Sequence, residues 1–315
     1  KNRNINISSN EQDSLLYLSA EKAYLNGEAE HSRELFNEYL TRFADGQFTL
    51  KAHFYLAQSL FNDENLDKAI SHYEYVIKQP LNSFTETALY NLATIYRDKS
   101  NANKAWEYYS RLEPIASNKR MLMESRVGQM RAAIKLEDYK KVEKAASQIL
   151  ITEKLPEEIA REARFNKARA LENLGRNTEA LVQYRLVAQN LQTPQGAESK
   201  YAVARLEYEA GKTALAENEI QNFIKNGTPH QYWLGKSFLL LARIYQASGK
   251  AFQAKAYLQS IIDNYAIKDD GIIKEAEERL AEITTSEDVK FETGKDADLE
   301  LELDPNSKVD TTQLK

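Results

Sequence analysis

Side chains that could carry out catalysis are few in this sequence of 315 residues. The chain has no cysteine, which excludes disulfides, thiolate chemistry and cysteine-based zinc sites. No phosphate-binding glycine loop, zinc-protease helix or nucleophile elbow is present. The four histidines follow no ligand spacing and are interpreted as surface or packing residues: His31, His53, His72 and His230. The sequence therefore predicts a protein that is not an enzyme and that holds no metal and no cofactor.

Four arginines recur at a regular spacing in the second half of the chain. Arg131, Arg169, Arg205 and Arg243 are separated by 38, 36 and 38 residues. Arginine binds carboxylates through two parallel hydrogen bonds, and aromatic rings add apolar contact and cation–π partners. This spacing favours a basic ladder that could bind a protein or peptide segment, including an acidic one. The alternative is that the arginines form ion pairs with acids on neighbouring turns, namely Glu162, Glu172, Glu198 and Glu209.

The elements that position these arginines are indicated by a repeat of about 37 residues. A small or aliphatic residue recurs along the chain, in the series Ser32, Ala69, Ala105, Val142, Ala180, Ala216 and Ala254. Such self-similarity is typical of a solenoid, in which stacked helix pairs bury apolar faces that neither helix could bury alone. Residues that tolerate the left-handed conformation recur at the expected turns: Gly27, Asn65, Asn101, Asp138, Gly175, Gly211 and Gly249.

These repeats resemble the tetratricopeptide repeat (TPR) family. The family pattern places a small residue on the first helix, Tyr or Leu three positions later, a turn, an Ala on the second helix and an aromatic residue four positions after it. The second, third and seventh repeats follow it well, the seventh through Ala242, Tyr245, Gly249, Ala254 and Leu258. Repeats four to six depart from it, with basic residues at a position that is usually aromatic: Arg126, Arg164 and Lys200.

The resemblance implies an all-α, right-handed superhelical solenoid of about seven helix-turn-helix repeats with a C-terminal capping helix. In TPR proteins the first helices line a concave groove, and the fifth and ninth positions of each repeat point into it. Here this implies a partner-binding groove formed by Arg131, Arg169, Arg205 and Arg243 together with Phe54, Tyr90, Phe165 and Tyr201. Some TPR domains clamp a peptide C-terminus with Lys and Asn at these positions, and that activity is not carried over to this chain.

Four segments are expected along the chain: a flexible lead-in over 1–11, seven repeats over 12–266, a capping helix over 267–285 and an acidic tail over 286–315. Asp269 and Asp270 are interpreted as a helix cap and not as a calcium loop, because no further ligands follow at the required spacing. The tail is interpreted as disordered, although alternating Leu and acidic residues over 299–304 would also suit an extended segment lying in a groove. Because the first residue is Lys1, we expect a processed or truncated chain.

The favoured function is a non-enzymatic protein-interaction scaffold, and the alternative is a structural spacer within a longer TPR array. Residues 1–285 carry equal numbers of acidic and basic side chains, which disfavours a nucleic-acid partner. No apolar run approaches the roughly 18 residues of a transmembrane helix. The repeats also resemble TPR proteins of bacterial cell envelopes, which implies a periplasmic or outer-membrane-associated location and a role in an envelope assembly, with the cytoplasm as the alternative. The sequence leaves the oligomeric state open.

Overall fold

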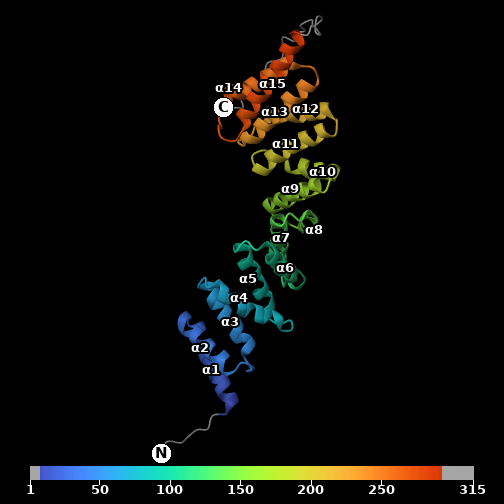
Figure 1. The fold of residues 1–315 in the computed structure, drawn as a ribbon. Coiled ribbons are helices and arrows are strands. Elements are labelled where there is room, and N and C mark those ends of the chain that lie inside the picture. Colours follow the sequence, from blue (N-terminus) through green and yellow to red (C-terminus); the bar gives the residue numbers. More distant parts are fainter. Residues whose placement is uncertain (1–7, 293–315) are drawn as a thin grey trace, which may run out of the picture. The chain divides into compact units, whose positions relative to one another are not determined.

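The computed structural model describes residues 8–292, with the backbone alone for 286–292, so most of the predicted tail and residues 1–7 of the predicted lead-in lie outside the described residues. Within this range the chain forms fifteen α-helices, one short 3₁₀ helix at Glu113–Ile115 and no strand (Figure 1). The predicted all-α repeat solenoid is therefore confirmed, while its right-handed superhelical winding stays a prediction. The chain divides into two compact units, residues 1–151 and 152–315.

Unit 1 contains four pairs of helices. Each first helix packs against the second helix of its own pair, and the second helices of the first three pairs pack against the first helix of the next pair. The pairs are α1 (Ser9–Leu25) with α2 (Ala29–Arg42), α3 (Thr49–Asn62) with α4 (Leu66–Lys78), α5 (Thr85–Asp98) with α6 (Ala102–Leu112), and α7 (Lys119–Lys135) with α8 (Tyr139–Leu150).

Unit 2 contains three pairs and a final helix. The pairs are α9 (Glu157–Asn173) with α10 (Asn177–Val187), α11 (Pro194–Glu209) with α12 (Thr213–Asn226), and α13 (Gln231–Ala247) with α14 (Ala251–Asn264). The final helix α15 (Ile272–Glu292) packs against α13 and α14 and so takes the place of another first helix. Asp270 caps it by accepting a hydrogen bond from the Ile272 N–H at 3.1 Å. This helix runs seven residues past the boundary expected at residue 285.

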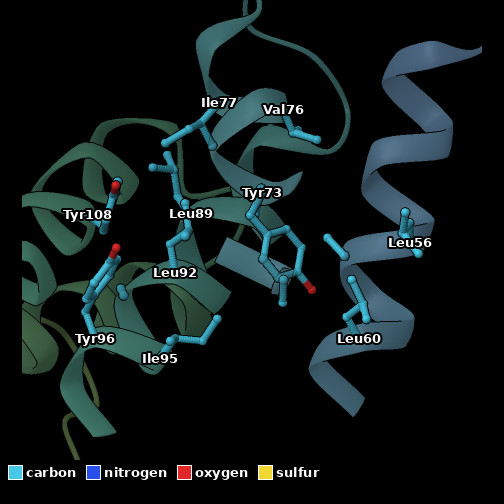
Figure 2. Packing of buried hydrophobic residues seen from close by; sticks show 14 of the residues in the cluster. Leu56, Leu60, Tyr73, Val76, Ile77, Leu89, Leu92, Ile95, Tyr96 and Tyr108 are labelled. Carbon is cyan, nitrogen blue, oxygen red and sulfur yellow. The ribbon is translucent and has the colours of Figure 1, made fainter. Parts of the chain in front are cut away.

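The core of each repeat forms where the small residues allow two helices to approach closely. The seven recurring residues from Ser32 to Ala254 are between 0 and 2% exposed. Large side chains fill the space between successive pairs, and Figure 2 shows Tyr73 of α4 with Leu60 of α3 and Leu92 of α5 around it. The Tyr73 hydroxyl accepts a hydrogen bond from Asn91 Nδ2 at 2.7 Å, which satisfies this polar atom inside the core.

The turns inside the repeats show one correction to the sequence analysis. Gly27, Gly175, Gly211 and Gly249 have the expected positive φ, from 73° to 79°. In the other three repeats the left-handed residue lies one position earlier than predicted, at Glu64, Ser100 and Glu137, with φ from 53° to 58°. The predicted residues Asn65, Asn101 and Asp138 are instead the N-caps of the second helices, and at two of them a side-chain oxygen accepts an otherwise unpaired N–H. Asn101 accepts from the Lys104 N–H at 3.2 Å, and Asp138 from the Lys141 N–H at 3.1 Å.

Candidate functional site

A pocket of about 570 Å³ lies in unit 2 between the first helices α11 and α13 and the final helix α15. Its volume falls within the range of pockets that hold small ligands or short peptide segments. The lining residues recur at one-turn spacing, so each helix presents a single face to the pocket. They are Tyr201, Arg205, Tyr208 and Glu209 of α11, Lys236, Leu239, Leu240 and Arg243 of α13, and Glu275 and Arg279 of α15.

Three of the four cations that line the pocket are held by carboxylates. Arg205 forms ion pairs with Glu172 of α9 at 2.5 Å and with Glu209 at 3.0 Å. Lys236 and Arg279 share Glu275, at 3.1 and 2.8 Å. Burial opposes the ionisation of Glu275, but the hydrogen bond from Lys236 and the charges of both cations hold its pKa below the usual value. These pairs join neighbouring first helices and leave little of their charge for a ligand.

Arg243 is the fourth cation, and it makes no ion pair with any residue in the described part of the chain. Its side chain is exposed, and its guanidinium carbon lies 5.5 Å from the centre of the Tyr208 ring. A cation–π contact of this kind orients the guanidinium without neutralising its charge. The pocket lining carries four positive charges and the two negative charges of Glu209 and Glu275. Glu172, which pairs with Arg205 from outside the lining, adds a third negative charge. The net charge of the group is therefore +1.

The repeat explains why Arg243 differs from Arg205. Arg205 of α11 contacts Glu172 of α9, which belongs to the preceding repeat. The equivalent position one repeat later, 36 residues after Glu172, is Tyr208, and Arg243 contacts its ring in the same way. An aromatic ring therefore stands where the preceding repeat has a carboxylate.

Aromatic and aliphatic side chains complete the pocket. Leu239 and Leu240 are 2% and 7% exposed and form an apolar surface beside Arg243. Tyr201 is half-buried, with its ring centre 5.6 Å from that of Trp233. Burial raises the pKa of Tyr201, so its hydroxyl stays protonated and can donate a hydrogen bond. The pocket thus offers hydrogen-bond donors and one free positive charge next to apolar surface, an arrangement that suits a carboxylate flanked by aliphatic groups.

Of the eight residues predicted to line a groove, the structure brings Tyr201, Arg205 and Arg243 together in this pocket. Arg169 is exposed on α9, 5.7 Å from the Phe165 ring, and Phe165 itself is only 7% exposed and packs in the core of unit 2.

The remaining three predicted residues belong to unit 1. Arg131 is exposed on α7 next to a small cavity of about 30 Å³. Phe54 and Tyr90 are half-buried against the core of unit 1, with the Phe54 ring stacked on Phe84 at 4.4 Å. A continuous ladder through Arg131 and the three later arginines therefore stays a prediction. The alternative of ion pairing is confirmed for Arg205, because Glu172 and Glu209 are two of the four acids named for it.

Sequence reasoning missed Tyr208, Lys236, Glu275 and Arg279 as pocket residues. A signal for two of them was present, because Tyr208 lies one helical turn after Arg205 and Lys236 lies two turns before Arg243, on the same helix faces as these predicted residues. Among residues 8–285, no group of three or more His, Asp or Glu side chains could hold a metal ion. No helix in the described part of the chain is long and apolar enough to cross a membrane.

Comparisons with known proteins support the repeat assignment. A tetratricopeptide repeat family model matches residues 232–266, which span α13 and α14. The TPR fold is in general a non-catalytic fold that mediates protein interactions. No curated protein matches this sequence.

Solved structures share the helical repeat fold at low sequence identity. The structure of Naa15/Naa10 bound to HypK-THB has a TM-score of 0.53 at 14% identity, and the match covers 89% of this chain and 43% of that chain. A tetratricopeptide repeat protein from Parabacteroides merdae ATCC 43184 has a TM-score of 0.41 at 17% identity, covering 86% of this chain and 98% of that chain. Yeast Tom70 has a TM-score of 0.43 at 13% identity, covering 92% and 66%. At these identities the likeness concerns the fold alone.

Proposed function

We propose that the protein is a non-enzymatic interaction scaffold that binds an acidic protein or peptide segment in the pocket formed by α11, α13 and α15. The observation that carries this proposal is the exposed guanidinium of Arg243, which is oriented by Tyr208 and lacks a carboxylate partner among the described residues. A carboxylate from a partner would supply the contact that Glu172 supplies to Arg205 in the preceding repeat. Leu239, Leu240 and Tyr201 would contact the apolar side chains next to it.

Extended or helical segments of a partner fit this proposal better than a small metabolite. The lining of the pocket comes from the first helices α11 and α13 and the final helix α15, which pack side by side in that order. A segment crossing them would meet cationic and apolar side chains in turn. Charged hydrogen bonds contribute about 1.5–3 kcal/mol each, so a single carboxylate bound to Arg243 would account for about 10- to 100-fold in affinity.

A second function, a structural spacer within a longer TPR array, is favoured by the ion pairs between neighbouring first helices. The Arg205–Glu172 pair joins α11 to α9, and the Lys236–Glu275 pair joins α13 to α15. Such contacts stabilise stacking whether or not a ligand is present. The two functions differ in what happens when Arg243 is changed, because this residue contributes no ion pair to the stack within the described chain.

The test is a fluorescence-polarisation titration with two short labelled peptides, one of alternating Glu and Leu and one of alternating Lys and Leu. We expect the acidic peptide to bind the wild-type chain and to bind Arg243→Glu at least 10-fold more weakly, since one charged contact becomes a repulsion. Tyr208→Glu should weaken binding similarly, because the new carboxylate can pair with Arg243. The matched control is Lys225→Glu, which reverses the charge of an exposed lysine on the second helix α12. Equal affinities for all four chains, or no binding of either peptide, would leave the spacer function.

The proposal includes a periplasmic or outer-membrane-associated location, for which the support is the resemblance to envelope-type TPR proteins alone. Fractionation of cells that express the natural gene from its own locus would test it. Recovery of the protein with the cytoplasmic fraction would contradict this location and would leave the binding proposal unaffected.

A further inference from the structure

The helix α15 that lines the pocket is followed in the sequence by an acidic stretch of the same chain. Leu299, Leu301 and Leu303 alternate with Glu300, Glu302 and Asp304, and all six lie outside the described residues. In an extended chain, alternate side chains point to opposite sides, so the carboxylates would share one side and the leucines the other. This composition matches the combination of one unpaired cation and apolar surface that the pocket offers.

The helix that lines the pocket also brings this stretch within reach. Arg279 of α15 lies at the pocket, and the helix continues for thirteen residues to Glu292, a length of about 20 Å. Seven further steps along the chain lead from Glu292 to Leu299, and they can span up to about 23–25 Å when extended. A chain that turns back at the end of α15 can therefore return to the level of Arg279, and the following five residues add about 17 Å across the pocket.

We infer that residues 299–304 of the same chain occupy the pocket between α11, α13 and α15 and compete there with the partner segment. This inference rests on the proposed function, because it identifies the occupant of the same site when no partner is bound. The carboxylates of Glu300 and Glu302 reach the Arg243 guanidinium, and the leucines contact Tyr201, Tyr208 and Leu240. A short tether gives the segment an effective concentration on the order of 1 mM, so weak intrinsic binding is sufficient for occupancy.

The absence of cysteine from the sequence allows a direct test on the full-length chain. A nitroxide spin label is attached at Asn306→Cys, just beyond the acidic stretch, and NMR line broadening is measured at the amides of Tyr208, Leu240 and Arg243. We expect broadening at these amides at low ionic strength and its loss at high ionic strength, because salt screens exposed ion pairs. The broadening should disappear in Arg243→Glu and persist in the matched control Lys225→Glu. Combining Arg243→Glu with Glu300→Lys and Glu302→Lys should restore it.

A second measurement separates this inference from the proposed function. The labelled Glu–Leu peptide is titrated into the full-length chain and into a variant with Glu300→Lys, Glu302→Lys and Asp304→Lys. Competition by the tail predicts roughly 10-fold tighter peptide binding to the variant, as expected for an effective concentration well above the intrinsic dissociation constant.

Three combined outcomes of the two measurements would overturn the inference, the proposed function or both. Equal peptide affinity for both chains, with no broadening at the pocket, overturns the inference and leaves the proposed function standing. Failure of the peptide to bind either chain, together with no broadening, overturns both. Broadening that grows with protein concentration overturns the intramolecular form, because the segment would then come from a second copy of the chain.

Discussion

Replacing Glu137 with glycine should stabilise unit 1, although the change removes a side chain and adds no new contact. Glu137 has a φ of 53° and occupies the turn position that Gly175, Gly211 and Gly249 occupy in later repeats. Residues with a Cβ atom are strained in this left-handed region by about 1–2 kcal/mol, whereas glycine is not. The Glu137 side chain is exposed and forms no ion pair within the described chain, so little is lost with it.

The expected magnitude follows from two opposing terms. Relief of strain stabilises the folded state by about 1–2 kcal/mol, and the greater freedom of glycine in the unfolded chain offsets about 0.4–1 kcal/mol. The net gain in the free energy of unfolding should be about 0.5–1 kcal/mol. The opposite change, Gly211→Ala, should lose a similar amount in unit 2, because a Cβ atom at Gly211 would meet no other atom within 4 Å and only the φ of 75° is unfavourable.

The assay is urea denaturation followed by far-UV circular dichroism, fitted for each resolved transition because repeat proteins need not unfold in one step. Glu137→Ala is the control, since alanine removes the same carboxylate but keeps the Cβ strain, and its stability should stay near that of the wild type. A Glu137→Gly chain no more stable than Glu137→Ala would refute the reasoning. It would show that a positive φ at Glu137 costs no measurable stability, although the seven turns share this backbone geometry.

Two other predictions concern unit 1. The Nδ1 atoms of His53 and His72 lie 2.8 Å apart, burial and then the charge of His72 lower the pKa of His53 to about 4, and burial lowers that of His72. Because both folded pKa values lie below the unfolded value of about 6.5, the stability from the neutral pair is present above about pH 6.5 and is lost as the pH falls toward 4. Discounted for solvent screening of these half-buried rings, the loss between about pH 7 and about pH 5 should be on the order of 1 kcal/mol in urea titrations, and His53→Gln with His72→Gln should remove it. Ala93→Leu should cost about 1–3 kcal/mol, because Ala93 is 0% exposed where α5 closes against its neighbours, and a thermal melt unchanged by this substitution would contradict such close packing.

The repeat could be predicted from the sequence because its strongest constraint is local. A helix pair packs closely where a small side chain stands, so an alanine marks five of the seven repeats: Ala69, Ala105, Ala180, Ala216 and Ala254. The left-handed residue of a turn is harder to predict when it is not glycine, since Glu64, Ser100 and Glu137 carry no sign of it. The Asn or Asp that follows each of them is a residue type common in left-handed turns, but here it is the N-cap of the next helix.

The pocket could be predicted only in part because neighbouring helices decide which arginines are neutralised. Arg205 and Arg243 occupy equivalent repeat positions, yet only the fold shows that Glu172 reaches one and Tyr208 the other. Phe165 illustrates a related difficulty. An apolar residue on the first helix gives the same periodic signal whether it faces a groove or, as here, the core.

The contrast between Arg205 and Arg243 explains how a stacking contact inside the chain could be converted into the proposed binding site. In the pair formed by α9 and α11, the arginine and Glu172 come from adjacent repeats, so the contact is satisfied inside the chain. One repeat later the carboxylate is replaced by the Tyr208 ring, which keeps the guanidinium in place through its π face but leaves its charge available. The next helix could have supplied an acid, but Glu275 of α15 is shared by Lys236 and Arg279. The position of the free charge is therefore set by one aromatic residue at a position where its repeat neighbour has an acid. For this reason Tyr208→Glu is a sharper probe of the site than removal of the arginine, because it should restore the internal pair while leaving every cation of the pocket in place.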